Sequence, residues 1–173
     1  MRAALLQRLL AAGTLALVAC SPGGRGALEP VAGPGVALAS THGLPDDTAR
    51  LEAGGVRADV TGIWANKGPS VEISYQAGDA PATVPMASSV RWKGLTAAAT
   101  AAWDQTKPVP GNVMGRPLLG TPGLRLAARE RRTVLIVYDV PQGVDPPAYG
   151  DELAIDVPLP GGPRPATFRA GAE

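Results

Sequence analysis

The chain has 173 residues, with 16 Lys and Arg against 15 Asp and Glu, so its net charge is close to zero. This balance argues against nucleic acid as a partner, because such proteins present a basic surface. The 22 glycines and 18 prolines are too many for a helical bundle and favour an all-β domain with many turns.

The first twenty residues have the three parts of a secretory signal. Arg2 and Arg8 supply positive charge, residues 9–18 are apolar, and the small residue Ala19 precedes Cys20, the only cysteine. The apolar run is about half the roughly 20 residues that a membrane-spanning helix needs. Charge, a short apolar run and a small residue, in this order, are typical of a cleaved signal peptide.

The residues Leu17-Val18-Ala19-Cys20 resemble the lipobox of bacterial lipoprotein precursors. The resemblance implies that residues 1–19 are removed and that Cys20 is lipidated on its sulfur, with palmitate among the acyl chains. Two or more chains anchor a protein stably. In a Gram-negative cell, Ser21 implies transfer to the outer membrane, facing the periplasm; in other cells the cell membrane would hold it. An ordinary signal peptide with an incidental cysteine is the alternative.

Residues 20–55 are rich in Gly, Pro and Ala and show no lasting periodicity. They predict a lipidated N-terminus followed by a flexible linker, which leaves residues 56–173 as one folded domain. Loss of Arg2 and Arg8 from the 16 basic residues would leave 14 against 15 acidic ones. Neither an anionic lipid surface nor nucleic acid is therefore expected as an electrostatic partner.

Alternating apolar and polar residues predict strands from Val56 to Trp64 and from Val71 to Gln76. Residues 66–69 accept turn geometry, so the two strands are expected to form a hairpin. Pro85 interrupts the next apolar piece, which is at best an edge strand. Residues 90–93 predict another short strand.

The second half of the domain contains the longest apolar run. Residues 95–103 are rich in alanine, which favours a helix, but they also alternate, and their neighbours favour a strand. Residues 107–123 predict a long loop. The β-branched run 133–140 predicts a central strand buried on both faces. Residues 153–159 predict a late strand and 166–169 a final edge strand.

About seven short strands separated by Gly/Pro turns predict an antiparallel two-sheet sandwich. The block from Leu124 to Leu159 resembles the last part of immunoglobulin-like domains in bacterial exported lipoproteins. There, a polar turn such as 129–132 leads to a strong strand ending in Val-Pro, here 133–141, and an alternating strand follows, here 152–159. The resemblance covers about a fifth of the chain and implies an immunoglobulin-like fold without a catalytic signature.

Catalytic groups are scarce, and no cofactor is expected. His42 is the only histidine and falls in the predicted linker, whereas a catalytic triad holds its imidazole rigidly. The sequence therefore predicts a non-enzyme. Asp145, Asp151 and Asp156 supply oxygen ligands that suit calcium, although a solvated charged turn is the simpler interpretation.

Two further groups of side chains are candidates for a binding surface. Arg129, Arg131 and Arg132 form a basic cluster that suits an acidic peptide or lipid headgroup, or else a solvated turn that protects a strand edge. The three tryptophans suit a sugar-stacking or protein-binding surface, but in a domain with 4% aromatic residues they are more simply core. They are Trp64, Trp92 and Trp103.

These expectations define a lipid-anchored, non-enzymatic extracytoplasmic lipoprotein that works as a structural or protein-binding module of an envelope or secretion assembly. Its partners would be the membrane, through the N-terminal lipid anchor, and another envelope protein. A calcium- or glycan-binding lipoprotein is the alternative.

Overall fold

The computed structural model describes residues 25–41, 43–65, 67–106, 111–112 and 114–171. Every regular element in these residues is a strand. No helix in the described part of the chain is long and apolar enough to cross a membrane. The strands are β1 (Gly26–Val31), β2 (Ala37–Ala39), β3 (Thr48–Ala53), β4 (Val56–Ala65), β5 (Gly68–Ala77), β6 (Ala82–Val84), β7 (Ser89–Trp92), β8 (Leu95–Ala98), β9 (Ala101–Asp104), β10 (Arg116–Pro117), β11 (Leu124–Leu126), β12 (Arg131–Val137), β13 (Glu152–Val157) and β14 (Arg164–Ala170).

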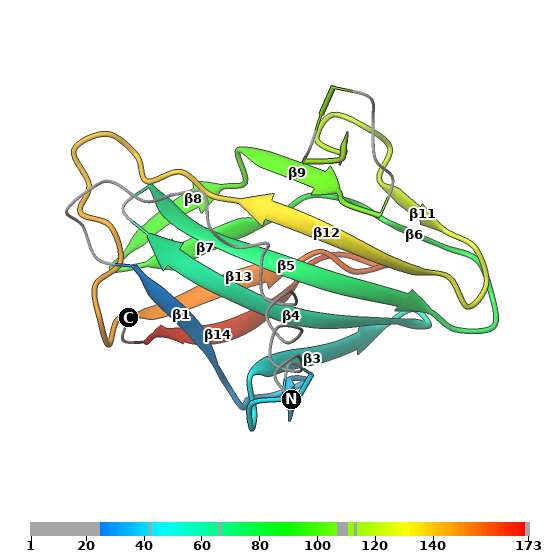
Figure 1. The fold of residues 1–173 in the computed structure, drawn as a ribbon, viewed down its shortest axis with the longest axis horizontal. Coiled ribbons are helices and arrows are strands. Elements are labelled where there is room, and N and C mark those ends of the chain that lie inside the picture. Colours follow the sequence, from blue (N-terminus) through cyan, green and yellow to red (C-terminus); the bar gives the residue numbers. More distant parts are fainter. Residues whose placement is uncertain (1–24, 42, 66, 107–110, 113, 172–173) are drawn as a thin grey trace, which may run out of the picture.

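Twelve of the strands form one curled sheet, and its strand pairings are antiparallel (Figure 1). The order is β10-β9-β12-β5-β4-β1-β14-β13-β7-β8, with β3 and β2 added beside β4. A separate ladder joins β11 to β6. The predicted all-β, antiparallel class is confirmed, but the described residues contain fourteen strands in place of the expected seven or so.

The sheet curls because two segments pass from one half of it to the other. Residues 26–27 of β1 pair with β4, and residues 28–31 pair with β14. At the opposite side, Ala99 donates its N–H to Ser88 O beside β7. The next residue, Thr100, donates its N–H to Val137 O at the end of β12. The half that contains β4, β5 and β12 is thereby held over the half that contains β13, β14 and β7 (Figure 1).

The hairpin of β4 and β5 forms as predicted. Its register runs from Ala65 opposite Gly68 to Val56 opposite Ala77. Because side chains alternate between the faces of a strand, Val60 and Ile73 are buried in the core, whereas their polar neighbours face outward. We call this outward side of β4, β5 and β12 the outer face.

Three aromatic side chains fasten the two halves of the sheet through their polar ends. Trp64 Nε1 on β4 donates to Gly171 O at 3.2 Å. Tyr75 OH on β5 donates to Pro158 O at 2.9 Å. Tyr138 OH, just after β12, shares a hydrogen bond with Ser88 Oγ. These three rings therefore fill the core while their polar atoms stay paired, as buried Tyr and Trp side chains usually do.

Alkaline pH is expected to destabilise the fold through Tyr75 and Tyr138. Burial raises the pKa of both phenols well above their ordinary value. A phenol of the unfolded chain ionises near about pH 10, so the stabilisation is complete below that pH and is lost as pH rises above it. Urea unfolding at increasing pH measures the loss. Tyr138→Phe should show a shallower fall in unfolding free energy, and an equal fall in both proteins would contradict the assignment.

The expected linker is wrong over its described part. Strands β1, β2 and β3 all lie within residues 20–55, and β1 and β3 pair with β4. Only β1 depends on distant partners, β4 and β14, so its order comes from tertiary pairing. The β2–β3 and β3–β4 pairs are local, and Gly54-Gly55, both with positive φ, close the β3–β4 hairpin with a turn signal that the sequence interpretation missed. The last strand, β14, is likewise not an edge, because β1 covers the side that β13 leaves open.

Two further expectations concern the second half of the chain. Residues 95–103 form β8 and most of β9, with a break at 99–100, so the choice of strand over helix is confirmed. The strand predicted over 133–140 is β12, but it is fully buried on one face only. Val134 and Ile136 are fully buried, whereas Leu135 is half-buried on the outer face. Burial on both faces is thus a wrong prediction, because none of the described segments covers the outer face there.

Candidate functional site

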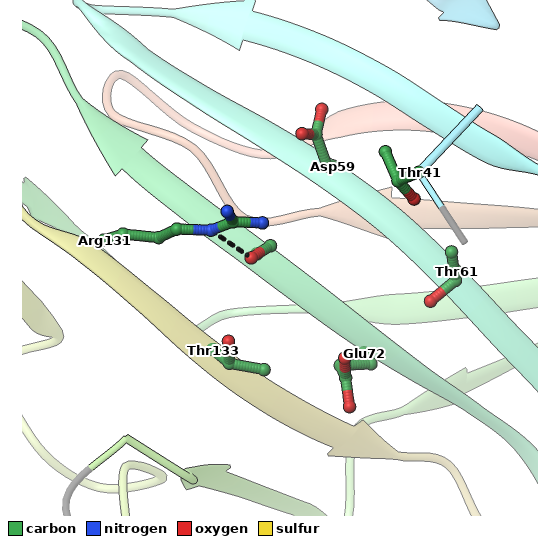
Figure 2. Close-up of a pocket in the computed structure, with 7 residues that line it drawn as sticks. Thr41, Asp59, Thr61, Glu72, Arg131 and Thr133 are labelled. Atoms are coloured by element: carbon green, nitrogen blue, oxygen red, sulfur yellow. Dashed lines mark hydrogen bonds between the residues drawn. The ribbon is translucent and has the colours of Figure 1, made fainter. Parts of the chain in front are cut away.

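A polar hollow of about 170 Å³ lies on the outer face of the sheet. Figure 2 shows that its side chains come from the adjacent strands β4, β5 and β12 and from the segment after β2. They carry hydroxyl, carboxylate and guanidinium groups. The lining residues are Thr41, Asp59, Thr61, Glu72, Ser74, Arg131 and Thr133.

The strand register places these polar groups together. Ser74 on β5 lies opposite both Asp59 on β4 and Thr133 on β12, which makes one row across three strands. Glu72 lies opposite Thr61 in the next row on the same face. Directly opposed side chains have Cβ atoms about 4.5–5.5 Å apart, so the two rows form a continuous polar surface.

Asp59 forms the buried part of this surface, with 8% of its side chain exposed. Arg50 on β3 holds it in a two-pronged contact, Nε to Oδ1 at 2.7 Å and Nη2 to Oδ2 at 3.1 Å. The hydrogen bonds to Asp59 raise the pKa of Arg50, against a smaller opposing effect of burial. Arg57 Nε adds a second positive group 3.7 Å from Oδ2. Asp59 is therefore an anchored structural carboxylate, held in place by the two arginines.

Two charged side chains of the hollow have exposed positions. Glu72 is exposed, and Arg131 donates its Nε–H to Ser74 Oγ at 3.0 Å. Thr41 closes one side, and its backbone N–H donates to Asp47 Oδ1 at 2.9 Å. Opposite charges beside several hydroxyls are suited to hydrogen-bonding a polar partner, such as a peptide segment or a sugar.

The predicted arginine cluster is divided among three places. Arg129, at the turn before β12, pairs with Asp79 at 2.8 Å, and both side chains are more than four-fifths exposed. Arg131 lines the hollow. Arg132 points inward, is 6% exposed and pairs with Asp104 at 2.7 Å. Its assignment to a binding surface is wrong, because alternation along β12 turns it to the same face as the core residues.

The three predicted calcium ligands do not come together. Asp151 pairs with Lys93 at 2.8 Å, and Asp156 pairs with Arg91 at 3.0 Å, while Asp145 is exposed in the loop before β13. Burial alone would raise the pKa of Asp151, but its hydrogen bond with Lys93 contributes to a net lowering. Within the described ranges, no three His, Cys, Asp or Glu side chains are grouped to hold a metal. The geometry therefore does not support the calcium alternative.

The tryptophans also differ in position. Trp64 and Trp92 are buried in the core. Trp103 is half-buried on the outer face of β9, opposite Leu135 of β12. Since Leu135 lies opposite Glu72, the backbone of Trp103 is two strand spacings, or about 10 Å, from that of Glu72. One aromatic ring thus flanks the polar groups on the same face.

Sequence reasoning missed most of the hollow, although part of the signal was present. The predicted hairpin already contained Asp59 and Thr61 on one strand and Glu72 and Ser74 on the other, at the polar positions of each alternation. Only the pairing of β12 with β5 could add Arg131, and this pairing is long-range. Cys20 and His42 lie outside the described residues, so the predictions made for them stay predictions.

Comparison with family models, curated proteins and solved structures finds no match for this chain. Its function has to be argued from its own residues.

Proposed function

We propose that this protein is a lipid-anchored, non-enzymatic extracytoplasmic lipoprotein that binds another envelope protein. The observation that carries the proposal is Leu17-Val18-Ala19-Cys20, which places the only cysteine at the end of a short apolar run. In a Gram-negative cell the protein would be held in the outer membrane and face the periplasm. The antiparallel, curled sheet supports an immunoglobulin-like sandwich as its finer fold.

The outer face is the proposed contact surface. Its hollow presents the exposed Glu72 and, farther along the strands, the guanidinium of Arg131, together with hydroxyl groups. Charges of both signs give an interface its register and specificity. Asp59, held by its ion pair with Arg50, forms the rigid floor of the hollow. A surface of this kind favours recognition of a partner over chemical change of a substrate.

Replacing Cys20 by serine is expected to abolish lipidation. Serine has no sulfur to carry the diacylglycerol, so the variant should take up no radiolabelled palmitate and should leave the membrane fraction. The measurement is palmitate incorporation in growing cells, followed by fractionation. A wild-type chain that takes up no more label than Cys20→Ser would defeat the proposed anchor.

The contact surface is tested by photocrosslinking in the cells that produce the protein. A photoreactive residue replaces Glu72 in the hollow or, as a control, the exposed Thr96 on β8 in the other half of the sheet. A discrete adduct with one envelope protein is expected from position 72 and not from position 96. Adducts from position 96 alone, or from neither, would contradict the proposed surface.

A glycan is the second candidate ligand, and the observation that favours it is Trp103 on the same face as the hollow. Hydroxyl and charged groups bind sugar hydroxyls, and an aromatic ring offers a stacking surface. Heat released on adding envelope oligosaccharides to the folded domain, absent in Arg131→Ala, would move the assignment from a protein to a glycan.

A further inference from the structure

The first strand begins very close to the proposed anchor. β1 starts at Gly26, so only residues 21–25 separate it from Cys20. An extended chain covers at most about 3.3–3.6 Å per residue, which limits the distance from Cys20 to Gly26 to about 20 Å. The long linker expected over residues 20–55 would allow several times that reach. The surface around Gly26 is therefore kept closer to the membrane than the opposite end of the domain.

The start of β1 lies at one definite end of the molecule (Figure 1). Gly26 pairs with Trp64, near the end of β4. Gly171 N donates to Ala27 O at 2.8 Å, and Gly150 N donates to Ala170 O at 2.8 Å. The start of β1, the loop of residues 138–151 and the end of β14 are therefore gathered there, and we call this the anchor end.

The anchor end exposes two large apolar side chains. Tyr149 is 74% exposed and immediately precedes Gly150, and Ile63 is 46% exposed and pairs with Ala27. Tyrosine is enriched at membrane–water interfaces, where its ring sits at the level of the headgroups. An exposed aromatic side chain within reach of the anchor is thus suited to lipid contact.

Charge at the anchor end is balanced. The basic residues Arg25, Lys67 and Lys93 are matched by the acidic residues Asp139, Asp145 and Asp151; the Lys93 ammonium pairs with the half-buried Asp151, and the other four are exposed. Contact with lipid would therefore not depend on an anionic bilayer. The opposite end of the β4–β5 hairpin carries the exposed, charged pair of Arg129 and Asp79.

We infer that the anchor end rests on the bilayer surface, with Tyr149 among the lipid headgroups and the Arg129 turn directed away from the membrane. This inference rests on the proposed lipidation of Cys20. It orients the domain, because β4 and β5, ten residues each, span about 33 Å between the two ends. The outer-face hollow then lies between the bilayer and the distal turns, where a partner in the periplasm reaches it from the side.

The orientation is tested on the acylated, mature protein in vesicles of phosphatidylcholine. Lipidation consumes the only cysteine, so Tyr149→Cys or Arg129→Cys supplies a single thiol for an environment-sensitive fluorophore. A nitroxide on the lipid headgroup then quenches by proximity. Severalfold stronger quenching is expected at position 149 than at position 129. Equal quenching, or stronger quenching at position 129, would overturn the orientation.

Vesicle flotation of the wild-type chain and of Cys20→Ser separates this inference from the proposed function. A wild-type chain that does not float with the vesicles overturns both. A wild-type chain that floats, with a serine variant that does not, upholds the anchor, and the quenching ratio then decides the orientation alone. Both labelled positions are exposed, and a third label at the exposed Thr96 on β8 should give intermediate quenching.

Discussion

Replacement of Arg132 by alanine should lower the free energy of unfolding by about 3–5 kcal/mol, the usual cost of breaking a buried ion pair by removing one partner. Arg132 Nη1 donates to Asp104 Oδ2 at 2.7 Å, and its Nε donates to Glu130 Oε1 at 2.6 Å. The side chains of Arg132 and Asp104 are 6% and 3% exposed. Without the guanidinium, Asp104 would be a buried carboxylate with no compensating charge. Urea unfolding of both proteins measures the loss.

The matched control is Arg131→Ala, one residue earlier on the same strand. Arg131 faces outward and is exposed, so its loss should cost no more than about 0.5 kcal/mol. The double variant Arg132→Met with Asp104→Leu removes both charges and should be more stable than Arg132→Ala. Equal effects of Arg131→Ala and Arg132→Ala would show that the inward pair does not stabilise the fold.

The same pair shows how far local pattern could predict the structure. Alternation in β4, β5, β7 and β13 gave those strands correctly, because polar and apolar positions differ along each of them. In β12 the apolar run is continuous, so the sequence suggested two buried faces. The alternation of Val134 and Ile136 does extend back to Arg132, which turns that arginine inward. A charged residue on the core face is poorly predicted from sequence, since its burial depends on a distant partner such as Asp104.

The N-terminal strands illustrate a second limit. β1 contains Pro30, and its pattern is weak, so nothing within Gly26–Val31 distinguishes it from a linker. It becomes a strand because β14, at the other end of the chain, offers its free edge. Pairing across such a separation depends on the whole fold rather than on propensity. The position of the anchor end was therefore not predictable, whereas the proposed lipidation of Cys20 rests on sequence alone.

Gly68→Ala should destabilise the protein by about 3 kcal/mol or more, because it combines a strained backbone with a steric clash. Gly68 begins β5 with φ at +124°, a region that residues with a side chain rarely adopt. A Cβ built there lies 2.0 Å from Tyr138 O, a backbone atom that cannot rotate away. The chain after β12 is fixed at this point by hydrogen bonds from Tyr138 N to Pro69 O and from Val140 N to Lys67 O. The clash must therefore displace one of the two segments.

Gly94→Ala separates the two causes. Gly94, in the turn between β7 and β8, also has a positive φ, at +76°, but no atom lies within 4 Å of its Cβ position. Only the backbone strain applies there, at about 1–2 kcal/mol. In thermal and urea unfolding, Gly68→Ala should be clearly less stable than Gly94→Ala. The clash should also displace Tyr138, whose hydroxyl joins the two halves of the sheet. If both alanines lower the free energy of unfolding equally, the close approach of β5 to the segment after β12 does not contribute to stability.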